Sequence, residues 1–159
     1  MSDINEVIKN KKTNINPIWI MRQAGRYLPE FRDIRKKNTD FIKLCLNYQL
    51  SAEITLQPLK RFNLDAAIIF SDILVIPYAL GQNIEFREIG GPWCPNFNLG
   101  KFLEVKDKDF LSTLNPIYKA IKDTKHTLKG NKSLIGFVGA PWTLITYLFN
   151  LKEKKNSNN

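Results

Sequence analysis

The segment DAAIIF, from Asp65 to Phe70, decides the fold. After one acidic residue it is continuously apolar, which is typical of a parallel strand buried on both faces. Two similar short runs, PIWIM at 17–21 and LIGFV at 134–138, predict strands of the same kind. The sequence therefore contains three candidates for buried parallel strands.

Helical patterns separate these strands. One helix is predicted from Ser51, as its N-cap, to about residue 62, with Pro58 as the point of a kink or break. Further helices are predicted over 111–128, despite an internal proline, and over 142–149. The order strand, helix, strand, helix, strand, helix predicts an α/β fold with parallel strands.

Shorter patterns predict helical turns at 30–37, which Pro29 opens, and at 40–45. A loop that enters a short helix is predicted over 73–80, and an exposed strand or hairpin arm at 84–88. The loop after that arm, GGPWCP, reads as turn-rich.

We predict one domain over residues 17–150. A flexible polar segment, 1–16, precedes it, and a polar tail, 151–159, follows it.

The composition is that of an ordinary globular protein, with 43% hydrophobic and 25% charged residues in a chain of 159. The N-terminus lacks the pattern of a secretory signal, and no apolar run is long enough to span a membrane. Cys45 and Cys94 are far apart and read as reduced thiols, so we expect a cytoplasmic protein. The net charge of +9 fits a solvated lysine-rich surface, a nucleic-acid binder or a site for an anionic small molecule.

A long motif narrows these alternatives. The segment IWIMRQAGRYLPEF at 18–31 resembles the signature of the uroporphyrinogen decarboxylase family. The resemblance continues in TLQPLKRF at 55–62, DAAIIFSDIL at 65–74 and GFVGAPWTLITY at 136–147. These blocks follow the order of the family and span nearly the whole chain.

The resemblance implies a (β/α)8 TIM barrel, which ordinarily needs about 250 residues. We therefore expect the N-terminal portion of such a barrel, incomplete, as in a truncated or split gene. A serine and a histidine of the family's site lie further along, and His126 matches neither of them. After Tyr147, the residues FNLK at 149–152 depart from the family's glycine-rich acidic segment.

The resemblance also implies a carboxy-lyase of haem biosynthesis, which converts uroporphyrinogen III to coproporphyrinogen III by decarboxylating four acetate side chains. It makes Arg22, Gln23 and Arg26 substrate-binding residues, with Arg22 also a candidate proton donor. A guanidinium forks onto a carboxylate, and the substrate carries eight carboxylates. The alternative is a pair of surface arginines bound to Glu30 or Asp33.

By the same resemblance, Asp72 is the main catalytic residue and binds the pyrrole NH groups. The alternative for Asp72 is a helix N-cap. Tyr147 is carried over as a substrate-binding residue, and its alternative is an aromatic on a core-facing helix side. No metal or organic cofactor is expected, because the protonated pyrrole itself serves as the electron sink.

The implied ligand is uroporphyrinogen, a polycarboxylate tetrapyrrole. Protein partners would be a second copy, forming a homodimer, or a complementing C-terminal half, and neither nucleic acid nor membrane is expected. The present chain would then be an inactive or split fragment, and a non-catalytic remnant or half of a two-chain enzyme is the alternative. A corrinoid-dependent methyltransferase is more distant, because its zinc-binding histidine and cysteine cluster is missing from the sequence.

Overall fold

The computed structural model describes residues 3–10, 16–87, 91–128 and 130–151. The chain divides into two compact units, and each is described by itself. The first unit consists of Met1–Ser71 and Pro116–Phe137, and the second of Asp72–Asn115 and Val138–Asn159. The chain therefore passes from one unit to the other three times.

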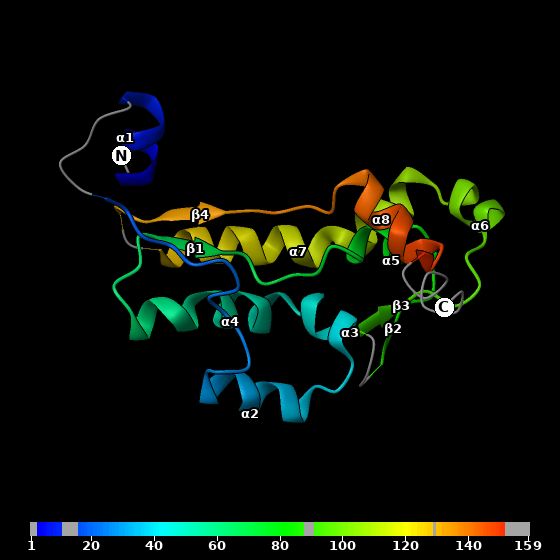
Figure 1. The fold of residues 1–159 in the computed structure, drawn as a ribbon, viewed down its shortest axis with the longest axis horizontal. Helices are drawn as coiled ribbons and strands as arrows, with labels where there is room; N and C mark the ends of the chain where they lie inside the picture. Colours follow the sequence, from blue (N-terminus) through cyan, green and yellow to red (C-terminus); the bar gives the residue numbers. More distant parts are fainter. Residues whose placement is uncertain (1–2, 11–15, 88–90, 129, 152–159) are drawn as a thin grey trace, which may run out of the picture. The chain divides into compact units, whose positions relative to one another are not determined.

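The sheet of the first unit confirms the predicted α/β class. Strands β1 (Ala66–Ile68) and β4 (Ser133–Ile135) pair in parallel, with Ala67 opposite Leu134, and they lie side by side in Figure 1. Both strands are shorter than the apolar runs that predicted them. One further bond, from the N–H of Ile69 to the carbonyl of Ile135 at 3.0 Å, extends the pair.

The prediction of a buried strand at 17–21 is wrong. These residues form no strand, and Ile18 and Met21 are 58% and 74% exposed. The segment does lie beside β1, because the N–H of Asp65 donates to the carbonyl of Ile18 at 2.8 Å. However, the Asp65 carboxylate takes the N–H of Ile18 at 2.6 Å, so no main-chain ladder continues from this residue. An apolar run indicates a preference for burial, but a strand also needs a partner along its length.

Helix α4 (Tyr48–Arg61) begins earlier than predicted. Its N-cap is Asn47, whose side chain accepts the N–H of Leu50 at 3.1 Å. The prediction that Ser51 is the cap is therefore wrong, because Asn47 supplies the same chemistry one turn earlier. Pro58 does not end the helix, since the N–H of Phe62 still donates to the carbonyl of Pro58 at 2.9 Å.

The two predicted helical turns are present as α2 (Pro29–Lys37) and α3 (Phe41–Cys45). Pro29 occupies the first turn of α2, where the missing N–H has no consequence. Asp40 caps α3 by accepting the N–H of Lys43 at 3.0 Å.

A buried apolar cluster of the first unit gathers around these helices and contains Leu28, Phe31, Leu44 and Ile54. The ring of Phe70, at the exit of β1, packs edge-on against Phe31 and Phe41, with each pair of centroids 5.8 Å apart.

Helix α1 (Asp3–Asn10) lies in the segment 1–16, for which we predicted no helix. The flexibility of that segment and the domain bounds 17–150 stay predictions. The predicted tail 151–159 lies outside the described residues except for Leu151.

The second unit holds α5 (Val75–Ala79), which confirms the short helix predicted there. Strand β2 (Glu85–Arg87) confirms the hairpin arm and pairs antiparallel with β3 (Gly91–Trp93). Neither β3 nor α6 (Leu99–Glu104) was predicted, because glycine and proline in β3 read as turn signals. Helix α8 (Pro141–Leu148) lies within one residue of its predicted bounds.

Helix α7 (Asp107–Thr127) begins in the second unit and ends in the first. It confirms the predicted helix, but it starts four residues earlier and continues through Pro116. The division between the units falls immediately before this proline. None of the helices in the described part of the chain is long and apolar enough to cross a bilayer.

Candidate active site

The arginine-bearing loop of the first unit starts with a tight turn over residues 20–23. The N–H of Gln23 donates to the carbonyl of Ile20 at 3.0 Å. Arg22, at the third position of the turn, has φ 61, in the left-handed region. That position normally carries glycine or asparagine, because a Cβ crowds the following carbonyl there. A bulky residue in this conformation is an outlier of the kind that concentrates at functional sites.

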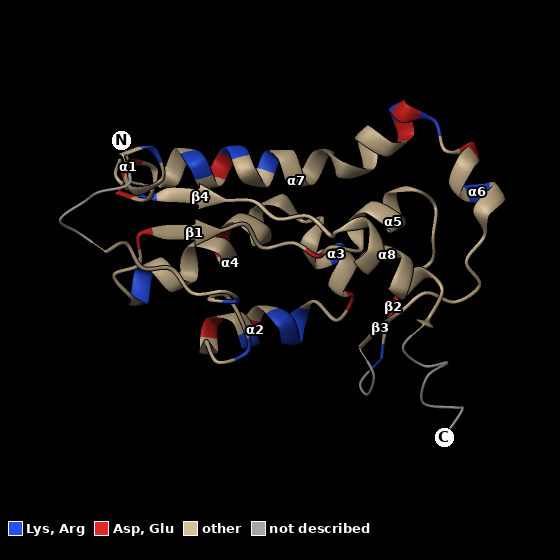
Figure 2. Ribbon diagram, turned by 45° about the horizontal axis from the view of Figure 1, so that its top comes forward, with Lys and Arg blue, Asp and Glu red and all other residues tan. Residues whose placement is uncertain are grey.

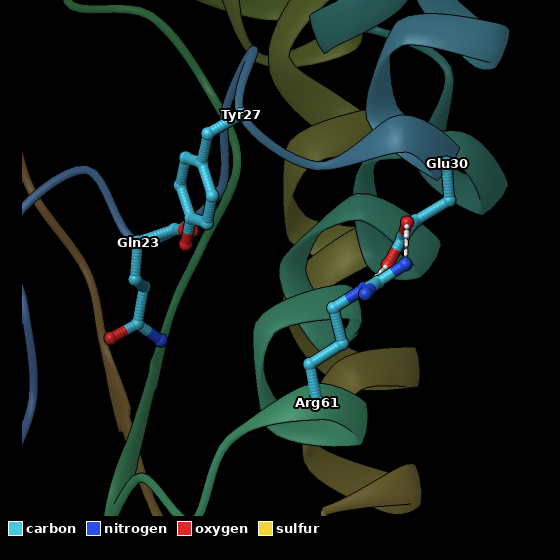
Figure 3. A network of polar contacts seen from close by, with 4 residues as sticks. All are labelled: Gln23, Tyr27, Glu30 and Arg61. Carbon is cyan, nitrogen blue, oxygen red and sulfur yellow. Dashed lines mark hydrogen bonds and ion pairs between the residues drawn. The ribbon is translucent and has the colours of Figure 1, made fainter.

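The side chain of Gln23 fastens this turn to the sheet. It is 2% exposed, its Oε1 accepts the N–H of Ile20 at 3.2 Å, and its Nε2 donates to the carbonyl of Ala66 in β1 at 2.8 Å. The hydroxyl of Tyr27 donates to the main-chain carbonyl of Gln23, and Figure 3 shows the tyrosine ring reaching over that carbonyl. The loop is thus tied to β1 at one end and closed on itself at the other.

Arg22 and Arg26 are both exposed, and no described residue offers either guanidinium a hydrogen bond or an ion pair. The carboxylates proposed as their alternative partners are engaged elsewhere. Glu30 receives a two-point contact from Arg61, at 2.6 Å and 2.9 Å (Figure 3). Asp33 lies 3.8 Å from the ammonium of Lys36. Two cationic groups of the loop are therefore available to an anion from outside.

The charges around the loop add to this cationic character. The hydrogen bond from Arg61 lowers the pKa of Glu30, so that carboxyl stays ionised and paired. Burial, and then the charge of Glu30, raise the pKa of Tyr27, so its hydroxyl keeps its proton and remains a donor. The last turn of α2 carries Arg35, Lys36 and Lys37 (Figure 2).

Two hydroxyls of α4 hold the exit of β1, a feature that the sequence analysis missed. Ser51 Oγ donates to the carbonyl of Phe70 at 2.6 Å, and Thr55 Oγ1 accepts the N–H of Phe70 at 2.8 Å. Both hydroxyl-bearing residues are fully buried. The available signal was a serine and a threonine four residues apart on an otherwise apolar helix face, where they lie one above the other.

Asp72, in the second unit, is half-buried. Its Oδ1 accepts the N–H of Leu74 at 2.8 Å, and no described residue donates to Oδ2. Burial raises the pKa of this carboxyl, and the hydrogen bond from Leu74 opposes part of the rise. The N-cap of α5 is Leu74, so Asp72 forms a local turn just ahead of the helix without capping it. One carboxylate oxygen is held in place and the other is available.

Tyr147 also lies in the second unit, on α8, and is half-buried. The start of α8 packs closely on the residue after Asp72. A Cβ on Gly139 would stand 3.0 Å from Cβ of Ile73 and 2.6 Å from a methyl of Leu144. Only glycine fits this approach, so Ile73 and the first turn of α8 belong to one packed cluster. The five predicted site residues thus fall into two groups, with Arg22, Gln23 and Arg26 in the first unit and Asp72 and Tyr147 in the second.

Comparison with known proteins shows which family the chain resembles. The family model described as uroporphyrinogen decarboxylase (URO-D) matches residues 1–159. A protein of Agrobacterium fabrum named uroporphyrinogen decarboxylase is 45% identical over 142 residues, which cover 89% of this chain and 41% of the relative. Proteins of the same name from Chelativorans sp. and Campylobacter jejuni are 48% and 45% identical, over 83% and 92% of this chain and 39% and 44% of their own lengths.

The chain therefore spans about two-fifths of the length of these curated relatives. The family model, in contrast, extends over every residue of the chain. By that match, the chain belongs to the uroporphyrinogen decarboxylase family.

Proposed function

We propose that this chain forms part of an enzyme that decarboxylates uroporphyrinogen III to coproporphyrinogen III. The observation that carries the proposal is the pair of exposed guanidiniums, Arg22 and Arg26, whose neighbouring carboxylates are already engaged. The proposed substrate has eight carboxylates around its rim and four pyrrole NH groups at its centre. Its recognition needs fixed cations for the rim and a fixed anion for the centre.

Arg22 and Arg26 are the proposed cations. Each guanidinium can form two parallel hydrogen bonds with one carboxylate, and both residues belong to a loop anchored to β1. Gln23 stands between them in the motif, and the resemblance groups it with the substrate-binding residues, although its buried amide is bonded to main-chain groups of Ile20 and Ala66. Arg22 is also the candidate proton donor, a demanding role for a group whose pKa exceeds about 12.

Asp72 is the proposed anion. Its Oδ1 is fixed by the N–H of Leu74, which leaves Oδ2 to accept pyrrole NH groups. In each decarboxylation a ring carbon gains a proton, and the carboxylate leaves as carbon dioxide. The electrons of the broken carbon–carbon bond pass into the protonated pyrrole. A second proton is then added to the side-chain carbon, which becomes a methyl group, and the ring carbon loses the first proton. Asp72 would stabilise the positive charge on the ring during these steps.

Tyr147 is proposed to hydrogen-bond either Asp72 or a substrate carboxylate. The chemistry needs no metal or organic cofactor, because the protonated pyrrole accepts the electrons of the broken bond.

We also propose that the chain is the opening part of a (β/α)8 barrel. The parallel pairing of β1 with β4 and the position of residue 18 beside Asp65 support this order of strands. In such barrels the site is built from the loops that follow the strands. Arg22 and Arg26 follow the 17–21 segment, and Asp72 follows β1. A cytoplasmic location and association with a second copy or a complementing C-terminal half complete the proposal.

A chimaera tests this function. Residues 1–150 are joined to the C-terminal part of the Campylobacter jejuni relative, and the products from anaerobic uroporphyrinogen are resolved by carboxylate number. We expect stepwise loss of four carboxyl groups. Asp72→Asn should lower the rate by about 100-fold or more, as loss of a transition-state electrostatic contact does, whereas exposed Lys122→Ala should change nothing. A chimaera that folds and turns over equally well with Asp72→Asn would refute the assigned role.

The isolated chain is assayed beside the chimaera. We expect no turnover above its own Asp72→Asn control, because the relatives that share this sequence are more than twice as long. Asp72-dependent turnover by the isolated chain would contradict this expectation.

A further inference from the structure

The left-handed conformation of Arg22 needs an explanation, because neither glycine nor asparagine occupies the position. Its φ of 61 places its Cβ against the following carbonyl, and an isolated turn would relax from this arrangement. A strained residue of this kind persists only where its surroundings over-determine it. The contacts that hold Arg22 in this backbone conformation must therefore come from neighbouring residues.

Gln23 supplies those contacts. Its Oε1 holds the N–H of Ile20, which opens the turn, and its Nε2 holds the carbonyl of Ala66. Its own N–H closes the turn on the carbonyl of Ile20, and its own carbonyl receives the Tyr27 hydroxyl. Every polar group of Gln23 is thus bonded within the first unit, on both sides of Arg22.

The burial of Gln23 bears on how it acts. At 2% exposure its amide faces the protein, whereas Arg22 next to it is exposed. To reach a ligand, the amide would have to give up the N–H of Ile20 or the carbonyl of Ala66, leaving a main-chain group unpaired.

We propose that Gln23 is a positioning residue. Its buried amide locks the 20–23 turn onto β1, and this lock keeps Arg22 in the left-handed conformation that presents its guanidinium. The Tyr27 hydroxyl is the second part of the same lock. The proposal rests on the proposed function in one respect, namely that Arg22 binds a carboxylate of the substrate.

A double-mutant cycle on the full chain tests the lock. Gln23→Met keeps the length of the side chain but removes both hydrogen bonds of the side-chain amide. Arg22→Gly removes the guanidinium and the backbone strain together. Binding of uroporphyrin III, a stable polycarboxylate, is followed by its fluorescence in all four variants. We expect Gln23→Met to weaken binding by about 10-fold, a coupling of ordinary size for neighbouring residues, and to have almost no effect once Arg22 is glycine. Equal losses in both backgrounds would overturn the proposal, because they would mean that Gln23 contacts the ligand itself.

Gln82→Met is the matched control. Gln82 is also buried, and its amide also bonds main-chain groups, at the carbonyls of Leu80 and Asn98, but it belongs to the second unit. We expect its loss to lower stability without any coupling to Arg22. Equal coupling to Arg22 from Gln82→Met would overturn the proposal, because the effect would then come from general destabilisation.

A second cycle needs no ligand, so it separates the lock from the proposed function. Thermal unfolding is measured for the same four variants. In the parent, Arg22→Gly should raise the melting temperature, because glycine adopts this φ without crowding. In the Gln23→Met background the gain should vanish, because the unfastened turn relaxes. If the effects of the two substitutions on the melting temperature are coupled but the chain does not bind uroporphyrin, the positioning role of Gln23 stands and the carboxylate-binding role of Arg22 is rejected. If the two substitutions change the melting temperature additively, the positioning role of Gln23 is refuted, whether or not the chain binds uroporphyrin.

Discussion

The Thr55 hydroxyl accepts the main-chain N–H of Phe70 at 2.8 Å and donates to the carbonyl of Ser51 at 2.7 Å. Ser51 completes the arrangement by donating to the carbonyl of Phe70 at 2.6 Å. The parallel ladder ends one residue earlier, at Ile69. Two side chains of α4 therefore bond the main chain at Phe70, where the hydrogen bonds of the sheet have ended. This position lies two residues before Asp72.

Thr55→Val should destabilise the chain by about 1–3 kcal/mol, because it leaves a buried N–H without an acceptor while preserving the shape of the side chain. Thr55→Ser, which keeps the hydroxyl, should reduce the free energy of unfolding much less. Urea denaturation measures both losses, and hydrogen exchange at the Phe70 amide should accelerate only in the valine variant. Equal losses for serine and valine would show that packing, and not the hydroxyl, is what matters.

Asp72→Asn should make the chain more stable at neutral pH. The folded-state pKa of Asp72 is raised by burial, so the folded chain binds more protons than the unfolded chain between the two pKa values. The stability of the parent is therefore full below the unfolded pKa of about 3.9 and falls as pH rises through the folded value. The advantage of asparagine should appear across that window and vanish below it. Denaturation curves of both proteins from pH 3 to 8 measure it, and an advantage independent of pH would contradict the assignment.

Arg61→Ala should destabilise the chain at neutral pH in low salt. The bond to Arg61 lowers the pKa of Glu30. The stability that this pair contributes is therefore present above the unfolded pKa of Glu30 and is lost as pH falls through the lowered folded value. Because both side chains are partly exposed, the difference should also shrink at high salt. An NMR titration should show the Glu30 pKa returning toward its ordinary value in Arg61→Ala, and an unchanged pKa would exclude the pairing in solution.

Pro116→Ala should stabilise the chain by about 1–3 kcal/mol. Pro116 lies inside α7, where it removes a helical N–H and crowds the preceding turn. Pro29→Ala is the matched control, since Pro29 stands in the first turn of α2 and removes no helical bond. Thermal and urea unfolding of both variants provide the comparison. A loss of stability in Pro116→Ala would contradict the cost assigned to this proline.

Local chemistry explains which elements could be predicted. The run DAAIIF identified β1, and Pro29 and Asp40 marked the starts of α2 and α3. The 17–21 strand failed because its apolar run could not reveal that the Asp65 carboxylate takes the place of a strand partner. Ser51 was a plausible cap on type alone, but its hydroxyl serves Phe70, which lies 19 residues away.

The same limit applies to the candidate site. The motif grouped Arg22, Gln23 and Arg26 as residues of one kind. Separating Gln23 from the arginines required its contact with Ala66, which lies 43 residues further along the chain. The engagement of Glu30 by Arg61 is likewise a contact over 31 residues. Side-chain type predicts what a residue can bind, but only the fold decides whether that capacity is already used.

The pairing of β1 with β4 also governs how the chain can be made. The two strands are separated by roughly 65 residues, so the entropy of closing that loop must be lost before any of their hydrogen bonds forms. During synthesis, β1 leaves the ribosome long before Ile135, so it forms before its strand partner β4 is available. In that interval the strand exposes the kind of edge on which nascent chains aggregate. The bonds of Phe70 to Ser51 and Thr55 involve only residues that precede β4, so they can hold the end of the strand during that interval.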